Sequence, residues 1–289
     1  METRGGDIVQ LFYNRTAGGH CPQRLAKLRC GFEAAGARVI LSECGPGSVI
    51  AIDAEASHIC ALGGDGTVRH IAHAVSRCGR TVPMSVYPAG TVNLLHRELG
   101  FSLDPGEHVR RALAGDAASL YYPVELNDTL FLACASVGPD SYAVHSLSSA
   151  LKRRIGRLAY AVALLRLLVR WPRHAINLEC DGRTIVCEAF YVAKGRFFAG
   201  PWSFAPDARL MEPKLHVIAM RNAGRLAYAR FAWTLFRDRR ADALPGVTAI
   251  TCTALTATAS APLPVQADGD IVATLPIAIR LHADPMRFC

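Results

Sequence analysis

The sequence predicts an α/β protein in which an N-terminal domain with a parallel sheet is followed by a β-rich domain of antiparallel, sandwich-like type. Strand-like and helix-like segments alternate over the first 120 residues, a pattern typical of a parallel sheet covered by helices. Beyond about residue 121 the segments are rich in Val, Ile, Thr and Ala, and Asp181-Gly182 gives a hairpin signal between two of them. We therefore expect domains over residues 1–120 and 121–289.

The expected elements follow in order along the chain. In the first domain, apolar runs and helical periodicity predict strands over residues 8–13, 38–41, 58–62 and 84–87, and helices over 22–35 and 68–77. In the second domain, strand-like runs cover residues 131–137, 175–179, 184–192, 214–220, 248–259 and 271–282, with helices near 148–170 and 225–237. Polar, glycine-bearing loops follow three of the early strands, so we expect a ligand at the carboxyl edge of the parallel sheet.

Composition narrows the class of protein. With 51% hydrophobic and 19% charged residues, the chain of 289 residues is globular rather than disordered. A net charge of +8, carried mainly by arginine, suits phosphates, acidic lipid headgroups or nucleic acid. No nucleic-acid-binding motif accompanies the charge, so that partner is not expected. The ten cysteines lack zinc-type spacing and are expected as thiols in a reducing compartment. Neither a signal peptide nor a membrane-spanning segment is expected.

A glycine-rich loop, Gly63-Gly64-Asp65-Gly66-Thr67, joins the third strand to the following helix. Glycines let the backbone approach a ligand closely. Thr67 is placed to cap the helix, whose N-terminal N–H groups and dipole favour a phosphate. Asp65 would repel a phosphate unless it binds a magnesium ion between them. The spacing matches neither the Walker A pattern nor the dinucleotide fingerprint, and a plain turn is the alternative.

Other loops strengthen the phosphate interpretation. Pro88-Ala89-Gly90-Thr91-Val92-Asn93 follows the fourth strand, and residues 14–18, with the Thr16 hydroxyl, follow the first. Far along the chain, Gln266-Ala267-Asp268-Gly269-Asp270 is either a hairpin turn or a pair of carboxylates. Phosphoryl transfer requires a carboxylate that accepts the proton of the attacking hydroxyl.

Taken in this order, the Gly-Gly-Asp-Gly-Thr loop, the Pro-Ala-Gly-Thr-x-Asn loop and the late Asp-Gly-acid turn resemble the diacylglycerol kinase catalytic family, which includes bacterial lipid kinases, sphingosine kinases and ceramide kinases. Gly138-Pro139-Asp140 and Ala205-Pro206-Asp207-Ala208 resemble further family segments, so the resemblance covers nearly the whole chain. It implies a nucleotide-binding α/β domain followed by a β-rich lipid-binding domain, with ATP and Mg²⁺ as cofactors.

The resemblance also implies roles for individual residues. Contacts to the nucleotide are implied for Asn14, Thr16, Gly18, Ser42, Gly63, Gly64, Asp65, Gly66, Thr67, His70, Gly90, Thr91 and Asn93. Asp65 would also bind magnesium, and Asp268 and Asp270 would supply the general base and its network; these three are the expected catalytic residues. Some bacterial members hold a structural magnesium after the Pro-Asp-Ala stretch, and here Glu212 takes the place of the family's aspartate as the candidate ligand.

The expected activity is transfer of the γ-phosphate of ATP to a primary hydroxyl of a membrane lipid, either diacylglycerol or ceramide or a sphingoid base. Two alternatives stay open. A soluble-substrate kinase of the NAD kinase type shares the Gly-Gly-Asp-Gly loop but lacks the Pro-Ala-Gly-Thr-x-Asn loop. A catalytically inactive relative that binds nucleotide or membrane is favoured by two departures from the family pattern, Leu94 for an aspartate and Asp270 for a glutamate.

Much of the positive charge lies in the second domain, between residues 152 and 173 and between residues 221 and 240. The basic cluster from Lys152 to Arg157 precedes an apolar stretch that ends at Val169, and it is either a solvated helix end or part of an interfacial helix on phospholipid headgroups. We expect an anionic membrane surface as a partner, with binding that weakens as salt rises. The expected location is the cytoplasm, peripherally on the inner face of the membrane; the oligomeric state is open, a homodimer included.

Overall fold

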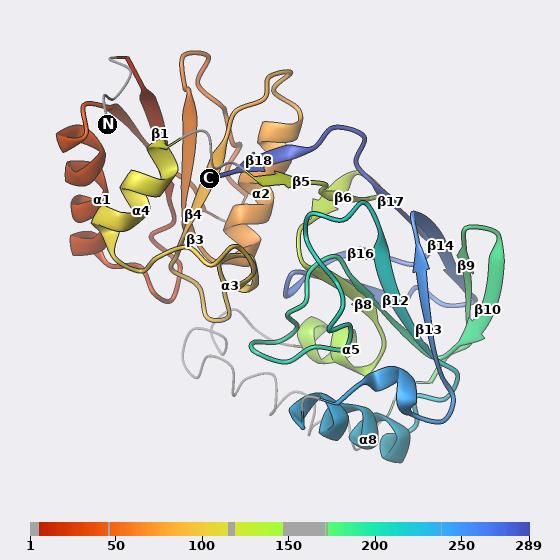
Figure 1. The fold of residues 1–289 in the computed structure, drawn as a ribbon. Helices are drawn as coiled ribbons and strands as arrows, with labels where there is room; N and C mark the ends of the chain where they lie inside the picture. Colours follow the sequence, from red (N-terminus) through yellow and green to blue (C-terminus); the bar gives the residue numbers. More distant parts are fainter. Residues whose placement is uncertain (1–5, 46, 115–118, 147–170, 172, 238) are drawn as a thin grey trace. The chain divides into compact units, whose positions relative to one another are not determined.

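The computed structural model describes residues 6–45, 47–114, 119–146, 171, 173–237 and 239–289. The chain divides into two compact units (Figure 1): unit 1 consists of Met1–Tyr122 with Ala283–Cys289, and unit 2 of Pro123–His282. The predicted fold class is confirmed, because a parallel-sheet unit precedes an antiparallel one. The helix expected near residues 148–170, with its basic cluster and apolar stretch, lies outside the described residues.

Unit 1 is a six-stranded sheet of order β2-β1-β3-β4-β18-β5 with helices around it (Figure 1). Strands β1 to β4 are mutually parallel, and β3 and β4 are buried along their whole length, as expected for parallel strands covered on both faces. The elements are β1 (Ile8–Tyr13), α1 (Pro22–Ala34), β2 (Arg38–Glu43), β3 (His58–Gly63), α2 (Asp65–Ser76), β4 (Met84–Pro88), α3 (Leu94–Leu99), α4 (Pro105–Leu113), β5 (Ser119–Tyr121) and β18 (Met286–Phe288).

The helices α1 and α4 lie side by side on one face of this sheet (Figure 1). Leu28 and Phe32 of α1 and Val109 of α4 pack against Leu11 of β1 and Leu62 of β3 in one buried cluster. Each of these side chains is at most 3% exposed. The sheet and its helices therefore form a closely packed base for the loops at the carboxyl ends of β1, β3 and β4.

The last residues of the chain, Ala283–Cys289, belong to unit 1. The sequence places them in the second domain, which is expected to run from residue 121 to residue 289. Strand β18 pairs parallel with β4 and antiparallel with β5. The Phe288 ring is 2% exposed and packs edge-on against Tyr121, with ring centroids 5.5 Å apart. Met286 and Phe288 alternate with exposed Arg287, and this pattern of period two buries two apolar side chains in unit 1.

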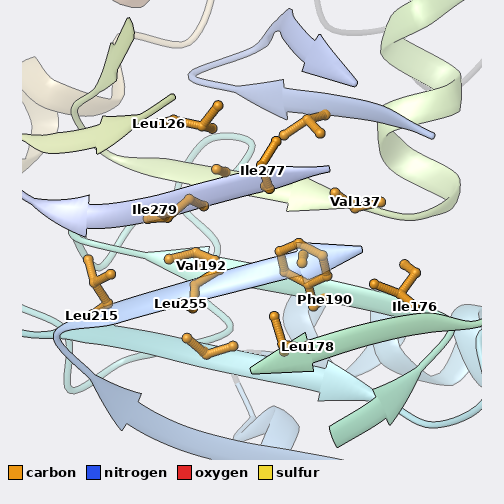
Figure 2. Close-up of a cluster of buried hydrophobic side chains, with 14 of the residues drawn as sticks. Leu126, Val137, Ile176, Leu178, Phe190, Val192, Leu215, Leu255, Ile277 and Ile279 are labelled. Atoms are coloured by element: carbon orange, nitrogen blue, oxygen red, sulfur yellow. The ribbon is translucent and has the colours of Figure 1, made fainter. Parts of the chain in front are cut away.

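Unit 2 is a sandwich of two six-stranded antiparallel sheets, of order β10-β9-β14-β17-β6-β7 and β13-β12-β11-β8-β15-β16. Its core lies between them (Figure 2): Leu178, Leu255 and Ile279 of the first sheet face Phe190 and Val192 of the second. The elements are β6 (Val124–Leu126), β7 (Thr129–Phe131), β8 (Cys134–Val137), α5 (Pro139–His145), β9 (Ile176–Cys180), β10 (Arg183–Cys187), β11 (Ala189–Ala193), β12 (Leu215–Met220), α8 (Arg225–Phe236), the 3-10 turn η1 (Ala241–Ala243), β13 (Val247–Cys252), β14 (Ala254–Ala259), β15 (Pro264–Ala267), β16 (Asp270–Thr274) and β17 (Ile277–Leu281).

Four runs expected as single strands each cross from one sheet to the other. They are the runs 131–137, 184–192, 248–259 and 271–282, which divide into β7 and β8, β10 and β11, β13 and β14, and β16 and β17. Polar contacts stabilise two of the crossings. Glu188 accepts a hydrogen bond from Ala223 N (2.8 Å) and pairs with Arg173 (2.7 Å). At the other crossing, Thr253 N donates to Asp181 Oδ2 (2.8 Å).

We predict that Phe288→Ala lowers the free energy of unfolding of unit 1 by about 3–5 kcal/mol, because it leaves a cavity beside Tyr121. Arg287→Ala, one residue away on the exposed side of the same strand, is the matched control and should change it by less than about 0.5 kcal/mol. Urea unfolding monitored by circular dichroism measures both. Equal midpoints for the two variants would contradict a structural role of β18.

Candidate active site

The loops that follow β3 and β4 touch through their backbones. A Cβ atom added to Gly90 would lie 2.5 Å from the Gly64 Cα, and one added to Gly64 would lie 2.9 Å from the Gly90 Cα. Neither glycine has a positive φ, so glycine is required here by the close approach and not by the backbone conformation. The two loops therefore form one continuous backbone surface at the carboxyl edge of the sheet.

The loop after β1 binds to both of the others. Gly19 N donates to Ala89 O (2.9 Å), and Asn14 Nδ2 donates to Thr67 Oγ1 (3.0 Å). Asn14 Oδ1 accepts from the backbone N and the hydroxyl of Thr16, each at 2.8 Å. The structure thus brings together the loops after β1, β3 and β4, which are the three loops predicted from the sequence to bind a ligand.

Helix α2 begins at Asp65, three residues before the expected start. Its N-cap is Gly64, which has no side chain to accept a hydrogen bond from the first turn. Thr67, expected as the cap, lies inside the helix instead, and its hydroxyl accepts from Asn14. The N-terminal amide groups of an uncapped helix, together with its dipole, attract an anion such as a phosphate.

Asp65 and Asn93 have different surroundings. Asp65, half-buried in the first turn of α2, accepts a hydrogen bond at Oδ1 from Leu95 N (3.2 Å). Asn93, in the left-handed conformation with φ 55°, closes its own loop, because Oδ1 accepts from Gly90 N (2.8 Å) and Nδ2 donates to Gly90 O (2.9 Å). If this backbone binds phosphates, the single carboxylate of Asp65 beside it suits magnesium, which usually takes one or two carboxylates together with substrate phosphates.

The remaining candidates of unit 1 lie in the loops, on α2 and in β2. Gly18 and Thr91 are exposed in their loops, and His70 is exposed on α2. Ser42 lies inside β2 and not after it, and its hydroxyl accepts from Gln10 Nε2 (2.9 Å). Because the Gln10 amide also contacts Ala51 O (3.0 Å), Ser42 belongs to an internal hydrogen-bond network of unit 1.

In unit 2, Asp268 and Gly269 form the two-residue turn between β15 and β16, with φ of 49° and 88°. The turn is a hairpin, yet its carboxylate faces inward: Asp268 is 6% exposed. Its Oδ2 accepts from Leu132 N (2.7 Å), and its Oδ1 accepts from Ala133 N (2.9 Å) and Cys134 N (3.2 Å). Asp270, the first residue of β16, is half-buried.

Asp140, which has no role in the sequence patterns beyond the Gly-Pro-Asp resemblance, is the centre of a polar cluster in unit 2. Ser136 donates to Asp140 Oδ2, and Ser136 Oγ also lies 2.9 Å from Gln266 Oε1 on β15. The Asp140 Oδ1 is shielded from solvent without a hydrogen-bond partner among the described residues, and burial raises the pKa of this carboxyl group. The sequence offered one signal for this cluster, namely that Asp140 is an acid in the first turn of α5, directly after the apolar strand β8.

Glu212 does not fit the role of a structural magnesium ligand. Its carboxylate pairs with Lys214 Nζ at 2.8 Å, and this ammonium group lowers the pKa of Glu212. Within the part of the chain that the structure describes, no three His, Cys, Asp or Glu side chains gather to hold a metal ion.

Comparisons with known proteins agree over both units. Residues 9–121 match the family model of the diacylglycerol kinase catalytic domain, and residues 133–288 match that of the YegS C-terminal NAD kinase beta sandwich-like domain. The chain is 24% identical over 241 residues to a diacylglycerol kinase of Bacillus subtilis (strain 168), covering 79% of this chain and 78% of the relative.

Two solved structures share the fold. A diacylglycerol kinase from Bacillus anthracis str. Sterne has a TM-score of 0.76 and 15% identity, with 99% of this chain and 97% of that chain covered. An NAD kinase from Archaeoglobus fulgidus, solved in complex with ATP, has a TM-score of 0.55 and 15% identity, with 97% and 92% covered. At these identities the likeness concerns the fold.

We predict that Gly90→Ala weakens ATP binding by at least about tenfold, because the new methyl group forces apart two backbones that ATP phosphates would contact together. Gly45→Ala, where the nearest atom to the added Cβ is 3.8 Å away, is the matched control and should bind ATP as the wild type does. Isothermal titration calorimetry measures both affinities. Equal affinity in Gly90→Ala and the wild type would rule out the Gly64–Gly90 surface as the phosphate site.

Proposed function

The chain belongs to the diacylglycerol kinase family, and from this premise we propose that it transfers the γ-phosphate of ATP to a primary hydroxyl of a membrane lipid. The backbone contact between Gly64 and Gly90 is the observation that carries the proposal. It offers a row of main-chain groups without side chains, which is what a polyphosphate needs for close approach. The uncapped N-terminus of α2 adds favourable electrostatics at the same place.

The residues of the glycine loops have separate roles in this proposal. The backbone of residues 64–67 and 90 binds the phosphates, and Asn14 holds Thr67 in place. Asp65 would hold a magnesium ion, which when bound neutralises phosphate charge. The hydrogen bond from Leu95 N orients the Asp65 carboxylate before the nucleotide arrives, so that little reorganisation is needed on binding.

Of the two late acids, Asp270 suits the general base better than Asp268. Both oxygens of Asp268 already accept backbone hydrogen bonds from residues 132–134, so this carboxylate serves to position the hairpin. Asp270, two residues on, then accepts the proton of the lipid hydroxyl while the hydroxyl oxygen forms the new bond to phosphorus and ADP leaves.

The acceptor is proposed as diacylglycerol, with ceramide or a sphingoid base as the next candidate. Thin-layer analysis of labelled phosphate transferred from ATP to a panel of these lipids, with NAD as the soluble acceptor, tests the proposal. Labelled phosphatidic acid is the expected product. The fold likeness to an NAD kinase makes labelled NADP the product that would identify the soluble-substrate alternative. ATP binding without transfer to any acceptor would identify an inactive relative.

The exposed face of α8 supports an anionic membrane as partner. Leu226, Trp233 and Phe236 are 77%, 60% and 61% exposed, and the two aromatic rings stack with centroids 5.7 Å apart. Arg237 lies over the Trp233 ring at 5.8 Å, and Arg230 is exposed on the same helix. Apolar side chains flanked by arginines suit the boundary between headgroups and acyl chains. We propose peripheral attachment to the inner, cytoplasmic face through α8.

None of the described helices is long and apolar enough to cross a membrane. Anionic headgroups would attract the arginines at a distance, and burial of the aromatic rings would hold the complex. Affinity for vesicles should therefore fall as salt rises, because salt screens the attraction of the arginines to the headgroups. The contribution from burial of the aromatic rings should persist at high salt.

We predict that Asp270→Asn lowers kcat for lipid phosphorylation by about 10²–10⁴-fold, because the amide no longer accepts the hydroxyl proton. Asp128→Asn changes an exposed acid of unit 2 in the same way and should leave kcat unchanged. Melting temperatures of both variants confirm that the fold is retained. Full activity of Asp270→Asn would exclude this residue as the base.

We predict that Trp233→Ser combined with Phe236→Ser reduces binding to phosphatidylglycerol vesicles by at least about tenfold, since two aromatic side chains lose their burial in the membrane. Val186→Ser, which changes an apolar residue 57% exposed on β10, is the control and should bind as the wild type does. Co-sedimentation at several salt concentrations measures the binding. An equal loss in the control, or no loss in the α8 variant, would count against α8 as the membrane face.

A further inference from the structure

Lys194 is a fully buried charged residue that none of the proposed catalytic steps uses. It follows β11, its side chain is 0% exposed, and its backbone N donates to Ala133 O (2.9 Å). A lysine is almost never fully buried unless its ammonium group finds partners, because an unpaired charge in the interior is very costly. The partners of its Nζ atom therefore reveal what the residue does.

Three backbone carbonyl groups of one turn surround the ammonium group. Lys194 Nζ lies 3.4 Å from Arg209 O and 2.7 Å from Glu212 O, and it also donates to Leu210 O. An ammonium group has three N–H donors and no acceptor, so three carbonyl oxygens match it. The turn is itself closed by bonds from Glu212 N to Arg209 O (3.2 Å) and from Lys214 N to Glu212 O (2.8 Å).

The acids around this turn are engaged elsewhere. Glu212 pairs with Lys214 (2.8 Å), and Asp207 pairs with Arg240 (2.9 Å); residues 205–214 contain no other acid. A hard divalent cation prefers carboxylate and carbonyl oxygens. Here the carbonyls contact an ammonium group and the carboxylates contact other basic side chains. The residues present do not fit the structural magnesium that the family resemblance implies.

We propose that the Lys194 ammonium group acts as a built-in cation of the 209–212 turn and replaces a structural divalent ion. The replacement holds two neighbouring strands together, because β11 ends just before Lys194 and the turn leads into β12, with Ala193 paired to His216. A covalently attached cation cannot dissociate or be chelated. The structural stability of unit 2 is then independent of magnesium.

The test uses the full-length chain without nucleotide, in an Asp65→Asn background, so that no response to metal comes from the glycine loops. Thermal unfolding is recorded in EDTA, in Mg²⁺ and in Ca²⁺, and metal content is measured by mass spectrometry. For each unfolding transition, we expect the melting temperatures in EDTA, in Mg²⁺ and in Ca²⁺ to agree within about 1 °C. We also expect mass spectrometry to detect no bound metal. A metal-dependent rise in either transition, or a bound stoichiometric ion, would overturn the proposal.

A second comparison tests the ammonium group itself. Lys194→Met keeps the apolar stem but leaves the three carbonyls without their donor, and it should lower the melting temperature by about 5 °C or more in the presence and absence of metal. Lys214→Met, which removes a lysine 44% exposed next to the same turn, is the matched control and should lower it by less than about 2 °C. Equal melting temperatures for Lys194→Met and the wild type would overturn the proposal.

Discussion

The nucleotide site proposed for unit 1 depends on the direct approach of two backbones, at Gly64 and Gly90. The approach follows from the sheet, because β3 and β4 are adjacent parallel strands and Ala89 N donates to Gly63 O (2.9 Å) just where the two loops begin. Any side chain at either glycine would separate the loops. Once they touch, the bond from Asn14 to Thr67 and the closure of the second loop by Asn93 fix the surface proposed for the phosphates.

Unit 2 uses backbone groups to stabilise buried charges of both signs. Asp268 is held by N–H groups of residues 132–134, and Lys194 is held by carbonyl groups of residues 209–212. In each case a charged side chain joins two segments of the chain, which lie 134–136 residues apart for Asp268 and 15–18 residues apart for Lys194. Truncating such a residue leaves backbone groups unpaired. Asp268 therefore has a structural role in the hairpin, which is why Asp270 is the proposed general base.

Local patterns predicted the first four strands and the first two helices of unit 1, but neither its later elements α3, α4, β5 and β18 nor the paths of the strands in unit 2. Strand β1 covers the expected residues 8–13, since short apolar runs ending in glycine loops are distinctive. The start of α2 was missed because Gly-Asp-Gly disfavours helix by propensity, although a helix can begin there. The four crossings were missed because β propensity continues on both sides of a change of sheet. The partners of Asp268 and Lys194 come from tertiary contacts, which no local signal predicts.

Hydrogen–deuterium exchange of the full chain with and without ATP and magnesium is the decisive measurement for the proposed phosphate site. Amides that bind phosphates exchange more slowly in the complex. We expect the strongest protection in peptides containing residues 64–67 and 89–93, and we expect its loss at both places in Gly90→Ala. Strong protection elsewhere in the chain, with unchanged exchange in these two loops, would contradict the proposed site.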